Sequence, residues 1–340
     1  MRLPKRFLAV PTALLAFFAA AQAGAHAQKP VAVAAYGDSW TKVSVGGQDW
    51  EAYLQSLLPK GSSVADRGVY SEDSGNIGFR EGGIKLALSS PVTLHAGSSA
   101  PVKIAVKAPI TFNEYQDAMP ASLGNVYGSV QFGTWSGGQF SPVSGGHPAG
   151  RVLTAAFTPA HAPSKNTSMG AGTQLGSPTA RPDAHKVQIL WQGGNDEDLP
   201  DNSKLAVKGT LEATRAEVQH LSAVHNHRFL VLSVLVNEYE VPALKGRTPM
   251  HLQWIHEINA GLKQAYPNNY VDLTDFLAKH ARGIARETGI KLYPQDLKAA
   301  AMGVVPDAFT VGDGVHLNAQ VRRLVQAPML ASKLRALGWA

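Results

Sequence analysis

The chain has 340 residues, 31 lysines and arginines against 25 aspartates and glutamates, a formal net charge of +6, and no cysteine. The absence of cysteine excludes disulfides, a thiolate nucleophile and cysteine-bound metals, so the fold must be stabilised by its core. No run of basic residues with interleaved aromatic residues is present, which argues against a nucleic-acid surface. The length predicts one large domain, or a domain with a sizeable insertion.

Residues 1–27 have the pattern of a cleaved signal peptide. Three of the first six residues are basic, residues 7–20 are apolar, and residues 25–27 read Ala-His-Ala, a small-residue cleavage site. The apolar stretch is short for a membrane span of about 20 residues, so a membrane anchor is the weaker alternative. We therefore expect export to the periplasm or the exterior of a bacterium, with no membrane span in the mature chain.

The first predicted unit is a strand followed by a helix. The apolar run Val31–Ala35 is typical of a buried strand, and apolar residues at helical spacing from Trp50 to Leu58 predict a helix that ends before Gly61. Between them, Gly37 lets the chain turn sharply, so Ser39 should lie where the strand opens into a helix. Nucleophiles occupy such positions in open α/β sheets, and so do ordinary turn residues.

The composition changes between residues 87 and 183. Short alternating runs such as Val102–Val106 stand among Pro, Gly, Ser and Thr, with turn signals every 8 to 12 residues or so, and this predicts antiparallel β-structure. The α/β pattern resumes after Pro182. We therefore expect residues 28–86 and 184–340 to form one α/β domain that carries residues 87–183 as a β-rich insertion.

The remaining elements predict parallel crossovers. Strands alternate with amphipathic helices, which indicates a doubly wound, mostly parallel sheet. The expected elements are a strand at Val187–Trp191, a helix spanning Leu211–Val224, a strand at Phe229–Val236, a helix at Leu252–Ala265, a strand at Tyr270–Leu273 and a helix after His316.

Polar residues follow these strands at the edge where ligands bind in open α/β sheets. The three stretches are Gly37-Asp38-Ser39, Gly193-Gly194-Asn195-Asp196 and Asp313-Gly314-Val315-His316. Each alone is explained by a turn or a helix cap. Together they supply a nucleophile, an amide donor, a base and an orienting carboxylate, which is the set that acyl transfer requires.

Other polar residues give weaker signals. An acidic run at residues 196–198 is more typical of a helix start than of a cation site. Asn237 and Glu238 follow a strand and could line a pocket. Five histidines lie close in sequence without a carboxylate at ligand spacing, so we expect no metal site and no cofactor; they are His220, His225, His227, His251 and His256.

The three stretches resemble the sequence blocks of the SGNH/GDSL hydrolase family, which read Gly-Asp-Ser, a glycine, Gly-x-Asn-Asp and Asp-x-x-His. The second block departs from that pattern. In residues 66–71, Asp-Arg-Gly-Val-Tyr-Ser, Gly68 matches an earlier glycine, and the family's oxyanion glycine falls on Ser71. Because that donor is a backbone N–H, a serine can supply it if the chain makes the same turn.

The resemblance implies the flavodoxin-like fold of the family and a role for each matching residue. Ser39 is then the nucleophile and a first oxyanion donor, with Ser71 and Asn195 as the second and third donors. His316 is the base, and Asp313 orients it. The residues Asp38, Trp40 and Asn237 are further expected to line the substrate.

The implied activity is that of a secreted serine esterase that removes O-acyl groups, acetyl groups first of all, from a carbohydrate. The insertion resembles accessory modules that bind glycans. Two alternatives stay open at this point: a lipase or arylesterase of the same fold, and a non-catalytic carbohydrate-binding or surface protein that retains the fold. The expected partner is an acylated carbohydrate or a small ester.

Overall fold

The computed structural model describes residues 29–42, 50–110, 112–114, 117–142, 145–147, 149–178, 180–196, 203–237 and 249–340. The predicted signal peptide, Glu197, Asp198, Glu238 and the side chain of His251 lie outside this description. Within the described ranges, no helix has the length and apolar character that a membrane crossing needs.

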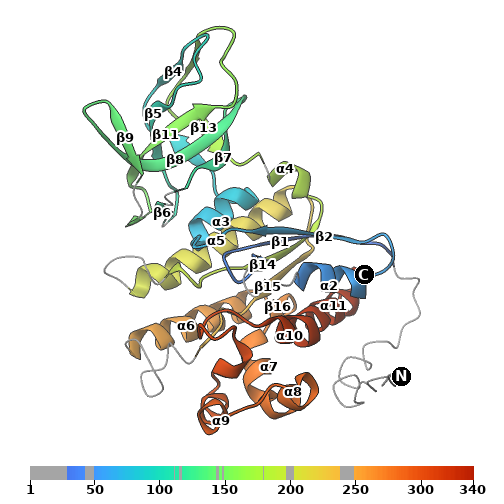
Figure 1. The fold of residues 1–340 in the computed structure, drawn as a ribbon. Coiled ribbons are helices and arrows are strands. Elements are labelled where there is room, and N and C mark those ends of the chain that lie inside the picture. Colours follow the sequence, from blue (N-terminus) through green and yellow to red (C-terminus); the bar gives the residue numbers. More distant parts are fainter. Residues whose placement is uncertain are drawn as a thin grey trace, which may run out of the picture.

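A five-stranded parallel sheet forms the centre of the α/β domain, with strand order β2-β1-β14-β15-β16 (Figure 1). Numbered along the chain this is the order 2-1-3-4-5, the flavodoxin-like arrangement of a doubly wound fold. Such a sheet is covered on both faces, which explains the continuous apolar runs of its central strands. The strands are β1 (Ala32–Gly37), β2 (Ser63–Gly68), β14 (Val187–Trp191), β15 (Phe229–Leu232) and β16 (Tyr270–Val271).

Two expected strands are shorter than predicted. The apolar run that continues after β15 to Val236 is buried but is not part of the strand. The strand β16 ends at Val271 because Asp272 caps the following helix, its side chain accepting a hydrogen bond from the N–H of Asp275.

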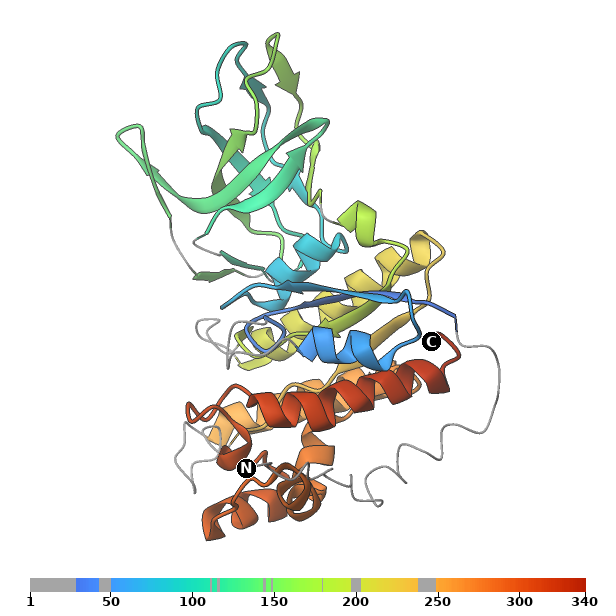
Figure 2. The ribbon, with the colours of Figure 1, turned by 45° about the vertical axis from the view of Figure 1, so that its right-hand side comes forward.

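Helices cover both faces of the sheet (Figure 2). On one face α2 (Trp50–Leu57) contacts α11 (Ala327–Ala336), and on the other α5 (Ser203–Ala223) contacts both α3 (Ser74–Glu81) and α6 (Pro249–Ala265). The chain after β16 forms α7 (Leu273–Lys279), α8 (Ala281–Thr288), α9 (Pro294–Ala301), a 3-10 turn (Asp307–Phe309), α10 (Ala319–Val321) and a π-helix (Arg322–Gln326) that leads into α11.

The β-rich insertion is an antiparallel barrel. Strand β11 pairs with β5 on one side and with β8 on the other, so the strands β11-β5-β3-β13-β7-β8 close on themselves, and β9 extends from β8. Two ribbons, β4 with β12 and β6 with β10, stand beside the barrel. The strands are β3 (Leu86–Leu88), β4 (Val92–Leu94), β5 (Val102–Lys107), β6 (Phe112–Glu114), β7 (Met119–Leu123), β8 (Val126–Ser136), β9 (Gln139–Pro142), β10 (Gly145–His147), β11 (Val152–Pro159), β12 (Thr167–Met169) and β13 (Gln174–Gly176).

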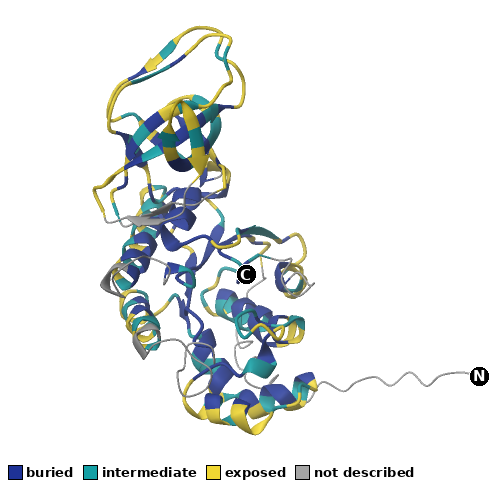
Figure 3. Cartoon of the chain, turned by 60° about the vertical axis from the view of Figure 1, so that its left-hand side comes forward, coloured by how far each residue is buried: buried dark blue, intermediate teal, exposed yellow. Residues whose placement is uncertain are grey.

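The barrel and the α/β domain share buried apolar surface. Phe79 of α3 and Ala213 of α5 belong to the same buried cluster as the barrel residues Phe132 and Phe157. Every residue of α3 is buried, and buried residues run from the barrel into the helices below it (Figure 3). The position of α3 therefore depends on both parts of the molecule.

The two ends of the insertion lie side by side. A Cβ atom added at Gly82 would lie 2.5 Å from the Cβ of Ala180. The barrel strands themselves run from Leu86 to Gly176, so the predicted boundary at residue 87 falls within β3, and residue 183 ends the short helix α4 (Ala180–Asp183).

Candidate active site

The turn after β1 carries Ser39. The carbonyl of Asp38 accepts hydrogen bonds from the N–H groups of Thr41 (3.1 Å) and Lys42 (3.0 Å), which close the turn. A Cβ at Gly37 would lie only 2.0 Å from the Thr41 hydroxyl oxygen, so glycine is required there. Ser39 is partly exposed in this turn, and α2 begins at Trp50.

A second tight loop carries Asp313 and His316. Thr310 and Leu317 form an antiparallel bridge at its base, and the N–H of Val311 donates to the carbonyl of His316 (2.9 Å). Within the loop, Asp313 Oδ1 accepts hydrogen bonds from the backbone N–H groups of Val315 (2.8 Å) and His316 (2.9 Å). These two hydrogen bonds hold the Asp313 carboxylate in the position from which it contacts the His316 imidazole.

The two loops bring Ser39, His316 and Asp313 into one hydrogen-bonded series. His316 Nε2 lies 2.8 Å from Ser39 Oγ, and His316 Nδ1 lies 2.6 Å from Asp313 Oδ2. Burial alone would raise the pKa of Asp313, but the N–H groups of His316 and Val315 and the imidazole together lower it below its usual value. An ionised Asp313 is an acceptor for a proton on His316 Nδ1, and with the proton there the unprotonated Nε2 faces the Ser39 hydroxyl.

Ser71 has the backbone conformation of a glycine position. Its φ is +59°, one of two positive values at non-glycine residues within the described chain. Among the described residues, no hydrogen bond from the backbone N–H of Ser39 or Ser71 to a protein acceptor is found. Both N–H groups can thus donate to a ligand.

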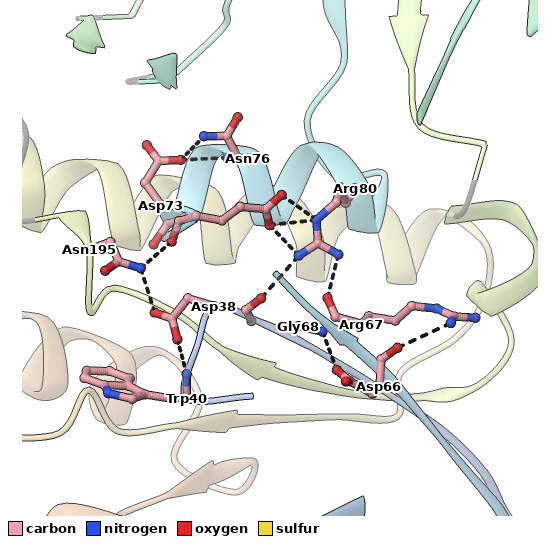
Figure 4. A network of polar contacts seen from close by, with 12 residues as sticks. Asp38, Trp40, Asp66, Arg67, Gly68, Asp73, Asn76, Arg80 and Asn195 are labelled. Atoms are coloured by element: carbon pink, nitrogen blue, oxygen red, sulfur yellow. Dashed lines mark hydrogen bonds and ion pairs between the residues drawn. The ribbon is translucent and has the colours of Figure 1, made fainter. Parts of the chain in front are cut away.

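Asn195 joins the turns that carry these two serines (Figure 4). Its Nδ2 donates to the carbonyl of Glu72 at 2.9 Å and lies 3.4 Å from Asp38 Oδ2. The second hydrogen bond is the longer and therefore the weaker of the two, and it is the one that an oxyanion would have to displace. Ser39 follows Asp38 and Ser71 precedes Glu72 in sequence, so Asn195 lies next to both.

A buried ion pair supports the Ser71 turn. Arg80 Nε donates to Glu72 Oε1 (2.8 Å) and Oε2 (2.6 Å), while Nη1 donates to the carbonyl of Arg67 (2.5 Å) and Nη2 to that of Gly37 (3.2 Å). One guanidinium group therefore ties the ends of β1 and β2 to the start of α3 (Figure 4). Glu72 and Arg80 are not predicted from the sequence, because nothing in their spacing marks them as a pair.

Asp196 binds α3 from the other side. Its carboxylate accepts hydrogen bonds from the Ser74 N–H (2.8 Å) and hydroxyl (2.6 Å) and from the hydroxyl of Thr210. Burial raises the pKa of Asp196. Its role in this structure is to hold the N-terminus of α3 against α5.

The three residues expected to line the substrate are buried. Asp38 is 1% exposed, Trp40 5% and Asn237 2%, so very little of these residues is open to a substrate, against the expectation. Asp38 Oδ1 accepts the N–H of Trp40 (2.8 Å), and burial raises the pKa of Asp38 to about 7. Trp40 packs on Trp191, with ring centroids 5.7 Å apart. Across the described chain, no group of three or more His, Asp or Glu side chains is arranged to hold a metal ion.

No protein-family model and no curated protein matches this sequence. Solved structures give distant matches. A lipase/acylhydrolase from Enterococcus faecalis is 9% identical with a TM-score of 0.43, over 90% of this chain and 95% of that one. A peptidoglycan O-acetylesterase is 13% identical with a TM-score of 0.36, over 91% of each chain. A gut microbial diltiazem-metabolizing enzyme is 10% identical with a TM-score of 0.42, over 94% of this chain and 49% of that one.

Proposed function

We propose that this chain is a serine ester hydrolase of the SGNH/GDSL type. The observation that carries the proposal is the unbroken series from Asp313 through His316 to Ser39, with contacts of 2.6 and 2.8 Å. These three side chains come from loops at opposite ends of the sequence, and among the described residues the backbone N–H groups of Ser39 and Ser71 have no protein acceptor. This arrangement of base, nucleophile and donors suits acyl transfer.

The proposed reaction has two halves. Ser39 Oγ attacks the ester carbonyl while His316 Nε2 takes the hydroxyl proton, and the imidazolium then protonates the departing alcohol. A water molecule, deprotonated by the same imidazole, attacks the acyl-serine and releases the carboxylic acid and free Ser39. The N–H groups of Ser39 and Ser71 and the Asn195 amide stabilise the oxyanion of each tetrahedral intermediate.

The proposed substrate is an O-acetyl ester on an exported carbohydrate. The barrel packs on α3, the helix that follows the Ser71 turn, and its ribbon strand β6 also contacts α3. A carbohydrate chain held by the barrel would then pass close to the proposed nucleophile. The expected signal peptide would place the protein where such polymers occur.

The alternatives predict different substrate preferences. A lipase or arylesterase would prefer esters with long acyl chains or aryl leaving groups, whether or not the ester is carried by a polysaccharide. A non-catalytic protein would bind carbohydrate without turnover, but the alignment of Ser39 with His316 is what a working nucleophile needs and favours the enzyme.

A comparison of three substrates tests the proposal. The purified mature protein is incubated with p-nitrophenyl acetate, p-nitrophenyl octanoate and an acetylated polysaccharide, with Ser39→Ala as the matched control. We expect acetate release from the first and third substrates, slow hydrolysis of octanoate, and no activity in the control. Faster turnover of octanoate would favour a lipase, and no turnover of any ester would contradict the enzyme.

A further inference from the structure

A cavity of about 370 Å³ lies where the barrel joins the α/β domain. The barrel contributes β7, the turn after it and β13 to its walls, and the α/β domain contributes α4 and the C-terminal ends of α3 and α5. Figure 1 shows α4 at this junction. The cavity is distinct from the proposed active site, because Ala184 and Val224 in its wall precede β14 and β15, whereas Asn195 follows the end of β14.

The titratable side chains that line this cavity are all basic. Lys85 comes from the segment after α3, Arg181 from α4 and His220 from the last turn of α5. Lys85 and Arg181 are exposed, and within the described chain neither side chain has a hydrogen bond or an ion pair. Burial, and after it the charge of Lys85, lower the pKa of His220, so the imidazole is a neutral polar group beside two cations.

Across the residues that the structure describes, no carboxylate lines the cavity. Two acids adjoin lining residues in sequence, Glu81 and Asp183, and both are buried, at 1% and 0% exposure. The carboxylate of Asp183 accepts a hydrogen bond from Arg67 Nε (2.6 Å) and pairs with Lys186 Nζ (2.6 Å), so its charge is already neutralised. The charge that the cavity presents to solvent is therefore positive, and an anion is the ligand that it attracts.

The size of the cavity and its neutral polar groups indicate an organic anion. A volume of about 370 Å³ is within the range of small-molecule pockets, so a lone inorganic ion would leave most of it unfilled. Ser122 Oγ donates to the carbonyl of Gly176 (3.2 Å), and Gln174 Nε2 donates to that of Gly172 (3.2 Å). The Ser122 hydroxyl oxygen and Gln174 Oε1 remain as acceptors, which suit the hydroxyl groups of a sugar.

We propose that this cavity is a second carbohydrate site, which binds a carboxylate-bearing sugar unit of an acidic polysaccharide. The planar guanidinium of Arg181 matches a carboxylate through two parallel hydrogen bonds, and the Lys85 ammonium adds a second charge. Ser122 and Gln174 accept hydrogen bonds from the sugar hydroxyls. A ligand in this position contacts the barrel and the α/β domain together. The site goes beyond the proposed esterase function and does not rest on it.

The direct test is isothermal titration calorimetry at pH 7 and low salt, with tetragalacturonate, the neutral cellotetraose and sodium sulfate as ligands. We expect millimolar or tighter binding of tetragalacturonate and no binding of cellotetraose at the same concentration. Arg181→Gln and Lys85→Gln should each weaken binding by about tenfold, because each removes a charge-assisted hydrogen bond. Lys103→Gln removes an exposed charge from β5, outside the cavity, and this matched control should stay within about twofold.

Undetectable binding of tetragalacturonate, equal binding of the two tetramers, or unchanged affinity in both cavity variants overturns the inference. Sulfate bound as tightly as tetragalacturonate overturns the assignment of a sugar. Lys85 and Arg181 are exposed, so the variants should fold, and circular dichroism verifies this. Their hydrolysis of p-nitrophenyl acetate should equal that of the wild type, because the cavity lies at the other edge of the sheet. A wild type without esterase activity contradicts the proposed function and leaves the binding test unaffected.

Discussion

Ser71 stands in a left-handed conformation, with φ at +59°. An L-residue pays roughly 1–2 kcal/mol for this conformation, and glycine avoids that cost at the expense of a more flexible unfolded chain. We therefore expect Ser71→Gly to leave the free energy of unfolding unchanged or to raise it by up to about 1 kcal/mol. Urea unfolding measures this, and kcat on p-nitrophenyl acetate should stay within about threefold, because the backbone N–H remains.

Ser71→Pro is the opposite change at the same residue. Proline has no N–H and fixes φ near −65°, so both the proposed donor and the turn are lost, and kcat should fall by about 10²-fold or more. Ser71→Ala keeps the N–H and is the control that should remain active. A folded and active Ser71→Pro protein, verified by circular dichroism, would show that Ser71 donates nothing to the reaction.

At the scale of single residues, the sequence predicts the site residues that directly follow an apolar strand or that share one short turn. Ser39 and Asn195 follow apolar strands, and Asp313 and His316 share one short turn, so their meeting is readable from the chain. The role of Arg80 cannot be predicted from the sequence, because it arises from burial and from partners that the tertiary fold supplies. The positive φ of Ser71 became visible only in the structure.

The helix α3 contains a buried carboxyl group at its last residue. Glu81 is 1% exposed, and its Oε2 accepts the N–H of Gly83 at 2.9 Å. Burial raises the pKa of Glu81 from 4.5 to about 8. The folded pKa then exceeds the unfolded one, so the native state holds more protons, and stability is lost as the pH rises from about 4.5 to about 8.

Glu81→Gln should remove this part of the pH dependence. The amide oxygen can still accept the Gly83 N–H, so the variant should match the wild type near pH 5 and be more stable than it at pH 9. Urea unfolding at pH 5, 7 and 9 provides the measurement. The exposed Glu257 of α6 offers the control Glu257→Gln, whose curve should follow the wild type. A Glu81→Gln protein that loses stability at alkaline pH as steeply as the wild type would contradict the assignment.

At the scale of elements, strand and helix types were predictable and their ends were not. The strands β1 and β14 follow from apolar runs, and α5 and α6 follow from apolar periodicity. The end of β16 depends on a cap at Asp272, and the continuation of β15 depends on what pairs with it. The cap joins Asp272 to Asp275, a local contact that an apolar pattern does not register, whereas strand pairing joins distant segments, which a local pattern does not contain.

The barrel and the sheet should unfold as one unit. Phe79 is buried in the barrel's cluster although it belongs to α3, and α3 is held to the sheet by Arg80. Calorimetry should therefore give a single transition whose calorimetric and van't Hoff enthalpies agree. Phe79→Ala should lower the free energy of unfolding by about 3–5 kcal/mol and keep the transition single. Two resolved transitions in the wild type would show that the insertion folds independently.

At the scale of the whole molecule, the sequence predicts an α/β domain with an antiparallel insertion, and the structure has both. The closure of the insertion into a barrel was not predicted, because it depends on β11 pairing with both β5 and β8. The packing of that barrel on α3 was also not predicted. It arises from Phe79 and the other buried residues of α3, a short helix that was not among the predicted elements.

The central claim is that Ser39 is a nucleophile activated by His316. The most direct measurement is covalent labelling with a fluorophosphonate, followed by intact mass and peptide mapping, because such reagents trap an activated serine without any assumption about substrate. We predict one adduct per chain on the peptide that contains Ser39, no adduct in Ser39→Ala, and labelling slowed by about 10²-fold or more in His316→Asn. An adduct on a different residue, or labelling of Ser39→Ala at the wild-type rate, would contradict the account.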